Sequence, residues 1–245
     1  MQGRTAAVEG VLLMADVWTF WTGPRPPWIS LCLETLSRHC PTIKVLDDSF
    51  WTSEFDANVP IQQLLESPAH FRSNLVRSWL LSKRGGIWVD ADCICLRDLQ
   101  PIAEKRASFT AYRQSKGGLC SALVSAKPGS QIAFRWWRLT KRQAATNIRS
   151  ESWDRLSLGP RLLGQAIAAV PSERVLYHPS SLVHPIHWRD HAAFVADVQP
   201  TIDPRAWCWM LTSGSLGDMR SWSRDQILES PTLIGRVFRH ALGMP

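Results

Sequence analysis

The chain has 245 residues, of which 45% are hydrophobic and 20% charged, and its formal net charge is +7. This length allows one large α/β domain or two small ones, and the apolar content excludes an intrinsically disordered chain. No apolar run reaches the ~18 residues that a membrane span needs, and residues 1–10 lack a signal-peptide pattern, so we expect a cytoplasmic protein.

The cysteines and the arginines narrow the class further. The six cysteines include no C-x-x-C pair, so we expect buried thiols and no disulfide framework. The positive charge comes from 22 Arg and only 6 Lys, and arginine binds phosphate bidentately, although a compositional bias of the source genome would give the same excess. The arginines are scattered and do not interleave with stacking aromatics, so we expect no nucleic-acid partner.

The first third of the chain alternates strand and helix patterns. Residues 11–21 form a β-branched and aromatic run that ends at a turn beginning with Thr22 and Gly23. A helix follows over residues 26–39, and a strand over 42–46 leads into a turn at Asp47 and Asp48. Because open α/β sheets bind ligands at the carboxyl ends of their strands, the end of this first strand is a candidate nucleotide site.

The central stretch joins a helix, two glycines, a strand and two carboxylates. Apolar residues over 68–83 recur with helical spacing, and Gly85 and Gly86 end that helix. The β-rich residues 87–89 then lead to Asp90-Ala91-Asp92. Asp is a poor strand former, so the strand ends there. Two hard oxygen ligands suit a divalent cation that carries phosphates, which predicts Mn²⁺ or Mg²⁺.

The second half continues the α/β pattern. Strands are predicted over 109–112, 119–126 and 206–209, and helices over 131–142, over 161–169 after Gly159-Pro160, and over 232–240. The last of these is a basic amphipathic helix within residues 230–245; it could rest on anionic lipid or pack against the domain. With no linker or repeat in view, we expect one domain over residues 1–245, with residues 1–10 flexible.

The central stretch resembles the DXD-type sugar transferases. Ser73-Asn74-Leu75-Val76-Arg77, Gly85-Gly86, Asp90-Ala91-Asp92 and Leu96-x-x-Leu99 together are similar to glycosyltransferase family 32, the group that includes capsular-polysaccharide transferases. The resemblance implies a GT-A fold, an α/β domain with a mixed, mostly parallel central sheet flanked by helices. We expect the two aspartates at the rim of its largest polar cleft.

The same resemblance implies roles for individual residues. Asp90 and Asp92 would hold the metal, Arg77 would contact the phosphates or the sugar, and Trp21 would stack on the donor's base, unless it is a core residue. Further donor contacts are expected from residues at the ends of these elements: Thr22, Gly23, Asn74, Gly86, Ala91, Ser121, Gly159 and Pro160.

Three positions depart from the family pattern. Asn74 replaces an Asp, Ser121 replaces an Asn, and Cys208 stands where many relatives carry a His that completes the metal shell. Thiolate is a soft ligand that suits Mn²⁺ or Mg²⁺ poorly, so a metal set of Asp90, Asp92 and Cys208 would be weak.

Together these features predict a metal-dependent, retaining glycosyltransferase. It would move a sugar from a UDP- or GDP-sugar to a glycan or lipid-linked acceptor in surface polysaccharide or glycolipid synthesis, with peripheral membrane contact. One alternative is phosphoryl or nucleotidyl transfer at the same site, which would need a Gly-rich phosphate loop or another carboxylate cluster. The other alternative is a degenerate nucleotide- or carbohydrate-binding module.

Overall fold

A computed structural model describes residues 14–53, 55, 61–103, 107–113, 118–150, 153, 158–187, 190, 192–211 and 216–245. The predicted flexible residues 1–10 and the first residues of the predicted strand over 11–21 lie outside these ranges. Within them, no helix is both long enough and apolar enough to cross a bilayer.

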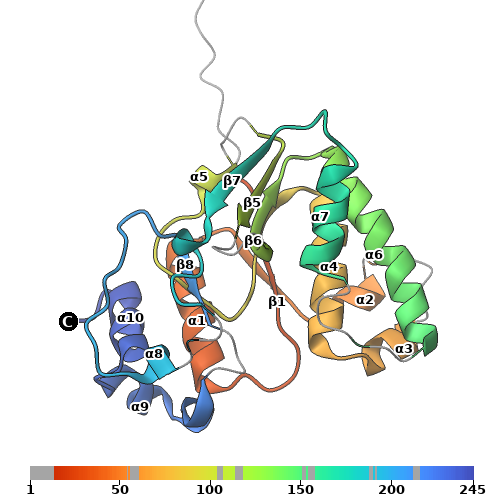
Figure 1. The fold of residues 1–245 in the computed structure, drawn as a ribbon. Helices are drawn as coiled ribbons and strands as arrows, with labels where there is room; N and C mark the ends of the chain where they lie inside the picture. Colours follow the sequence, from red (N-terminus) through yellow and green to blue (C-terminus); the bar gives the residue numbers. More distant parts are fainter. Residues whose placement is uncertain are drawn as a thin grey trace, which may run out of the picture.

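A six-stranded mixed sheet forms the centre of the molecule, in the order β2-β1-β3-β6-β5-β7 (Figure 1). The strands are β1 (Val17–Phe20), β2 (Ile43–Leu46), β3 (Gly86–Val89), β5 (Phe109–Arg113), β6 (Leu119–Ala126) and β7 (Val175–Pro179). β1 pairs in parallel with β2 and β3, and β5 pairs in parallel with β7, whereas β6 is antiparallel to both of its neighbours. The predicted α/β class with a mixed, mostly parallel sheet is therefore confirmed.

A second, two-stranded sheet pairs segments that are distant in sequence. β4 (Cys93–Cys95) runs antiparallel to β8 (Cys208–Met210), with Cys95 opposite Cys208. The late strand predicted over 206–209 thus exists, and it covers the segment that follows the two aspartates.

Helices cover both faces of the central sheet (Figure 1). One face carries α4 (Ala69–Lys83), α6 (Gln131–Ser150) and α7 (Pro160–Ala168), with the short α2 (Phe50–Ser53) and α3 (Ile61–Glu66) beside them. The other face carries α1 (Pro27–His39), the β4–β8 pair and the C-terminal helices. The C-terminal helices are α8 (Ala192–Val195), α9 (Arg224–Glu229) and α10 (Leu233–Leu242). Further short helical segments are α5 (Gln100–Ala103), η1 (Ser180–Leu182) and η3 (Gly217–Ser221).

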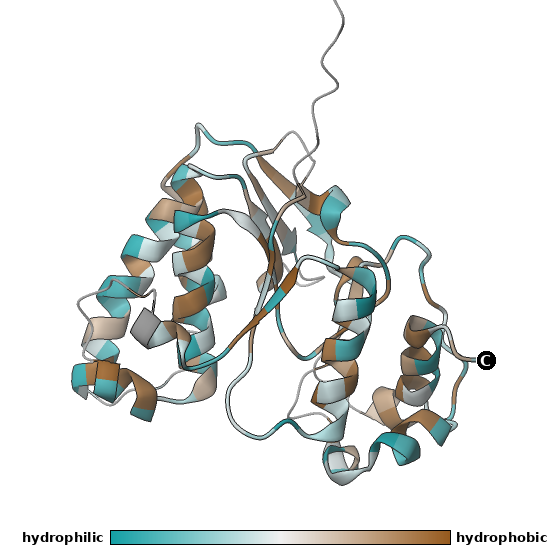
Figure 2. Cartoon of the chain, turned by 180° about the vertical axis from the view of Figure 1, so that it is seen from behind, coloured by the Kyte–Doolittle hydropathy of each residue, from teal (hydrophilic) through white to brown (hydrophobic). Residues whose placement is uncertain are grey.

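The strands divide their side chains between two apolar cores. In β3, Ile87 and Val89 pack on the α1 side and Trp88 packs on the α4 side, as expected from the two-residue period of a strand. Figure 2 shows hydrophobic residues concentrated in the central strands, while the helices alternate hydrophobic and hydrophilic segments. Trp18, expected to be a core residue, is 1% exposed.

The C-terminal helix packs against the protein. The apolar side chains of α10 are buried, including Leu233, Ile234, Val237 and Phe238, and its Thr232 cap accepts a hydrogen bond from the backbone N–H of Gly235. Because its apolar face is covered, α10 does not offer that face to lipid.

Candidate active site

The two strands that carry the predicted site end at the same edge of the sheet. β1 and β3 are parallel neighbours, with Val17 opposite Ile87, so Trp21 after β1 and Asp90 after β3 meet at that edge. At the start of β3, Gly86 has a φ of +94°, and an added Cβ would lie 2.5 Å from the backbone oxygen of Asp16. Only glycine fits at this first position of β3, and the position of the strand determines where Asp90 lies.

A cavity of about 370 Å³ opens at this edge. Most of the predicted site residues line it: Trp21, Thr22, Asn74, Arg77, Asp90, Ala91, Asp92, Ser121 and Pro160. The expectation that it would be the largest polar cleft is not confirmed, because hollows of about 420, 430, 560 and 630 Å³ lie elsewhere on the described surface. Its distinction is that carboxylates, a guanidinium and a half-buried tryptophan converge in it.

Arg77 and Asp90 form an ion pair at the wall of the cavity, with side chains 5% and 19% exposed. The same guanidinium donates a hydrogen bond to the hydroxyl of Ser121. The indole Nε1 of Trp88 also donates to Asp90, at 2.7 Å from Oδ1, and its ring lies 5.0 Å from the Arg77 guanidinium. Arg77 therefore holds a candidate metal ligand in place, a contact that the predicted role toward the donor did not include.

The carboxylates carry unequal costs of ionisation. Burial raises the pKa of Asp90, although the charge of Arg77 and the hydrogen bond from Trp88 oppose the shift. Burial and then the negative charge of Asp90 raise the pKa of Asp92 to about 8. Asp90 and Asp92 both lie near the single positive charge of Arg77, so the site has an uncompensated negative charge when both carboxylates are ionised.

The side chains at this edge supply some, but not all, of the ligands that a hard divalent cation needs. Asp90 and Asp92 supply oxygen ligands whose mutual repulsion a cation would relieve. The predicted third ligand is not there: among the described residues, no three His, Cys, Asp or Glu side chains are grouped so that they could hold a metal ion. Cys208 is fully buried in β8, opposite Cys95 of β4. A ligand set that includes Cys208 is therefore not what the structure brings together.

Trp21 has features of both a ligand-stacking and a packing residue. It is half-buried, lines the cavity, and packs edge-to-face on Trp28 with the ring centroids 6.3 Å apart. Its indole Nε1 donates to the backbone oxygen of Pro24 at 3.1 Å. This bond fixes the ring while one part of it faces the cavity.

The departures Asn74 and Ser121 lie side by side in the site. The amide of Asn74 donates to the backbone oxygen of His70 at 3.0 Å, and a Cβ at Gly159 would lie 3.0 Å from its Oδ1 and 3.6 Å from the Ser121 hydroxyl. Gly159, at the start of α7, thus gives these polar groups room. The predicted donor-site set of Asn74, Ser121, Gly159 and Pro160 is brought together from three elements.

Three predicted donor residues, Gly23, Gly86 and Gly159, are not among the residues that line the cavity. Gly86 lies at the opposite end of β3 and lines the 630 Å³ hollow instead. Its role is structural, because it allows the close backbone contact with Asp16 at the start of the strand. Gly23 has a φ of +81° with open space around it, beside Thr22, whose hydroxyl donates to Asp48. Asp48, expected at a strand-end turn, indeed follows β2 and also accepts a bond from Trp51.

Sequence reasoning missed several residues of the site. Trp88, which bonds Asp90, read only as an apolar strand residue; a tryptophan two positions before the first aspartate was the available signal. His70, Ser73 and Trp28 also line the cavity. The helical spacing of His70 and Ser73 with Asn74 and Arg77 could have marked that face of α4.

The comparisons with known proteins support the same assignment. Residues 28–109 match the family model described as "Glycosyltransferase sugar-binding region containing DXD motif". That range includes Arg77, Asp90 and Asp92. Over this third of the chain, the sequence is similar to the DXD-containing glycosyltransferases. A search of curated proteins finds no match.

Solved structures resemble the chain in fold. The glycosyltransferase GlyE of Streptococcus pneumoniae aligns with a TM-score of 0.50 at 13% identity, over 94% of this chain and 60% of that protein. The galactosyltransferase LgtC, solved with donor and acceptor sugar analogs, aligns at 9% identity over 94% and 96% of the two chains with a TM-score of 0.49. The PaToxG glycosyltransferase aligns at 15% identity over 94% and 78%, with a TM-score of 0.44. The GlyE alignment supports the GT-A fold expected from the sequence.

Proposed function

We propose that the chain is a glycosyltransferase that uses a UDP- or GDP-sugar donor and depends on a divalent cation. The reaction retains the anomeric configuration of the sugar. The acceptor is a glycan or a lipid-linked molecule in surface polysaccharide or glycolipid synthesis. The observation that carries the proposal is the convergence of Asp90, Asp92, Arg77 and Trp21 on one cavity at the ends of two parallel strands. Nucleotides bind at such edges in α/β sheets.

Asp90 and Asp92 would hold the cation, and neighbouring residues of the cavity wall fix the position of Asp90. When bound, Mn²⁺ or Mg²⁺ would neutralise charge that builds on the departing nucleoside diphosphate. Arg77 and Trp88 both bond to Oδ1 of Asp90, which fixes that carboxylate and leaves Oδ2 for another partner. Asp92 has no such ion pair among the described residues and carries the higher cost of ionisation.

The remaining residues would orient the donor. Trp21 would stack on the base, and Asn74 and Ser121 would offer neutral hydrogen bonds to the sugar. Among the described residues of the cavity we assign no covalent nucleophile, so we propose a front-face route with retention. Neither a Gly-rich phosphate loop nor a further carboxylate cluster is present among the described residues, which argues against phosphoryl or nucleotidyl transfer.

A donor screen tests the proposal. Thermal shift and calorimetry with UDP- and GDP-sugars, each with and without Mn²⁺, should show binding of one nucleotide class that strengthens with the cation. Asp92→Asn should remove the cation dependence. Donor binding with neither transfer nor donor hydrolysis would favour a degenerate binding module, and binding unaffected by cation would refute metal dependence.

A further inference from the structure

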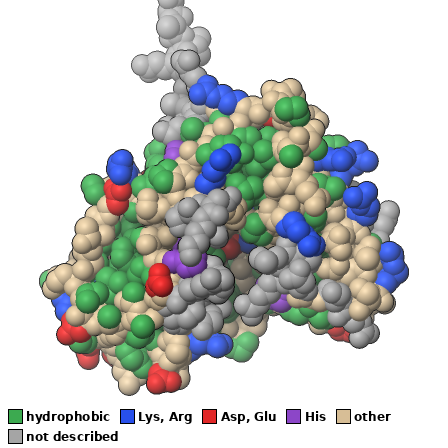
Figure 3. Space-filling view, in the orientation of Figure 1, with side chains coloured by type: hydrophobic (Ala, Val, Ile, Leu, Met, Phe, Trp, Pro, Cys, Tyr) green, Lys and Arg blue, Asp and Glu red, His purple; other side chains and the backbone are tan. Residues whose placement is uncertain are grey.

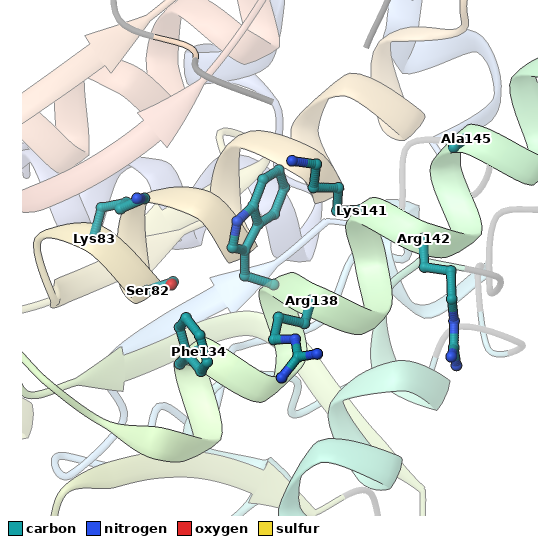
Figure 4. A pocket seen from close by; sticks show the side chains of 8 residues that line it. Ser82, Lys83, Phe134, Arg138, Lys141, Arg142 and Ala145 are labelled. Carbon is teal, nitrogen blue, oxygen red and sulfur yellow. The ribbon is translucent and has the colours of Figure 1, made fainter. Parts of the chain in front are cut away.

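A second hollow, of about 560 Å³, lies between the C-terminal end of α4 and the exposed side of α6 (Figure 4). Trp137 is 6% exposed and forms part of its wall. Four cations line it: Lys83, Arg138, Lys141 and Arg142. We call this surface the α4–α6 basic groove.

Among the described residues, no acidic side chain balances the positive charge of the groove by an ion pair. The 20 residues of α6 contain Arg135, Arg138, Lys141, Arg142 and Arg149 but no Asp or Glu. No carboxylate within the described part of the chain forms an ion pair with any of the groove's four cations. Figure 3 shows Lys and Arg side chains along the right edge of the molecule, where Figure 1 draws α6. Like charges along one helix repel each other, so such a face gains from an anionic partner.

An exposed aromatic ring stands among these cations. Phe134 is 48% exposed, and the Arg138 guanidinium lies 5.9 Å from its ring centroid. Figure 4 shows the Phe134 ring and Arg138 next to each other on α6, with Lys83 across the groove. A large apolar side chain that projects beside basic residues is the combination by which peripheral helices bind the interface of anionic membranes.

We propose that the α4–α6 basic groove binds the surface of an anionic lipid bilayer. Two observations favour a bilayer over a small soluble anion. With Arg135 and Arg149, which lie on α6 beyond the groove lining, the cations of this helix extend over about 20 Å at 1.5 Å per residue, much more than one phosphate group spans. Phe134 would gain nothing from a free anion, whereas it would gain from burial among acyl chains.

This assignment moves the expected membrane contact from α10 to α6. The apolar face of α10 is buried in the protein, while the apolar side chain of Phe134 is exposed. α4 carries Asn74 and Arg77 toward the candidate active site and Lys83 at the groove, so one helix joins the two regions. The proposal does not depend on the identity of the donor or acceptor.

Vesicle co-sedimentation of the full chain tests it. The probes are vesicles of phosphatidylcholine alone and vesicles of equal parts phosphatidylcholine and phosphatidylglycerol. We compare the wild type with Arg138→Glu/Arg142→Glu and with the charge-matched control Arg174→Glu/Arg220→Glu, whose side chains are exposed outside the groove. Phe134→Ser leaves the charge unchanged, and thermal melting checks that each variant is folded.

The wild type should bind the anionic vesicles and not the neutral ones. The groove double variant should bind at least about tenfold more weakly, because each basic residue near an anionic surface contributes severalfold to partitioning. The control should lose much less, and Phe134→Ser should lose roughly fivefold or more. Equal losses in the groove and control variants would overturn the proposal. Full binding by Phe134→Ser together with release by inorganic phosphate would also overturn it and would assign the groove to a soluble anion. Selective binding of RNA over vesicles would overturn it as well.

Discussion

Arg77 and Asp90 form an ion pair that joins the middle of α4 to the end of β3 at the wall of the candidate donor cavity. They are 13 positions apart in the sequence. The pair is mostly shielded from water; Arg77 also donates a hydrogen bond to Ser121, and Trp88 donates one to Asp90. A pair of this kind is sensitive to the loss of one member, because the other is left charged without a partner.

Arg77→Leu should therefore destabilise the fold as well as impair transfer. We expect a loss of about 3–5 kcal/mol in the free energy of unfolding, as for other buried pairs that lose one partner. Urea unfolding followed by circular dichroism measures it. The control is Arg224→Leu, which breaks the exposed ion pair to Glu34 and should cost about 0–1 kcal/mol. Adding Asp90→Asn to Arg77→Leu should recover part of the loss; equal small losses in the Arg77 and Arg224 variants would contradict a structural role for the pair.

Asp92→Asn should separate activity from stability. Transfer should fall by about a hundredfold or more, because a metal's charge stabilisation is worth several kcal/mol. Stability should stay the same or rise: the pKa of Asp92 is raised to about 8, so the folded state loses stability as pH rises from the unfolded pKa toward that value. A neutral Asn lacks this cost. The measurements are sugar transfer at saturating Mn²⁺ and melting temperature at pH 8. Unchanged transfer would exclude Asp92 as a metal ligand.

Gly86→Ala should show that this glycine is structural. An added Cβ would lie 2.5 Å from the oxygen of Asp16 and 2.8 Å from Trp18 Nε1, in a left-handed backbone conformation. The matched control is Gly129→Ala, which has a similar φ of +83° but open space around it. The Gly86 variant should lose about 1–3 kcal/mol more than the control, the usual cost of overpacking. A stable Gly86→Ala variant with weakened donor affinity would restore the predicted donor role.

Local patterns in the sequence predicted most elements of the fold. The helix predicted over 68–83 is α4, and the strand over 87–89 is β3 after one glycine, because helical spacing and a β-rich run between breakers are local signals. Two further expectations from the sequence pattern, a loop over residues 50–58 and a strand piece over 181–185, were wrong in part: residues 50–53 form a helix, and residues 180–182 form a helical turn. Such short segments take their form from tertiary contacts.

Contacts between distant elements limited the prediction of the site. No local pattern places Arg77 on Asp90 instead of on the donor, because that choice depends on how α4 crosses β3 and β6. The pairing of β4 with β8 likewise buries Cys208 opposite Cys95, over a separation that no local pattern encodes. Asp90 and Asp92 could be placed because a strand that ends in two acidic residues is itself a local feature.

Trp21 presents the last choice, between stacking on the donor and packing. Its ring lines the cavity but also meets Trp28 edge-to-face, and it is half-buried. If it stacks on the base, Trp21→Ala should weaken nucleotide-sugar binding by about tenfold to a hundredfold, since base–aromatic stacking is worth about 1–3 kcal/mol. Trp21→Phe should recover much of that loss. Calorimetry with the donor that gives the largest thermal shift measures both.

The control for Trp21 is Trp18, three positions earlier in β1 and 1% exposed. Trp18→Ala should cost about 3–5 kcal/mol of folding stability, as for tryptophans in other cores. Trp21→Ala should cost less, because the ring already faces the cavity on one side and only part of its packing is lost. Donor affinity should fall in the Trp21 variant at a melting temperature near that of the wild type. A melting temperature that falls as far as in Trp18→Ala, with donor affinity unchanged in the protein that stays folded, would make Trp21 a core residue and leave the base to be held by other groups of the cavity.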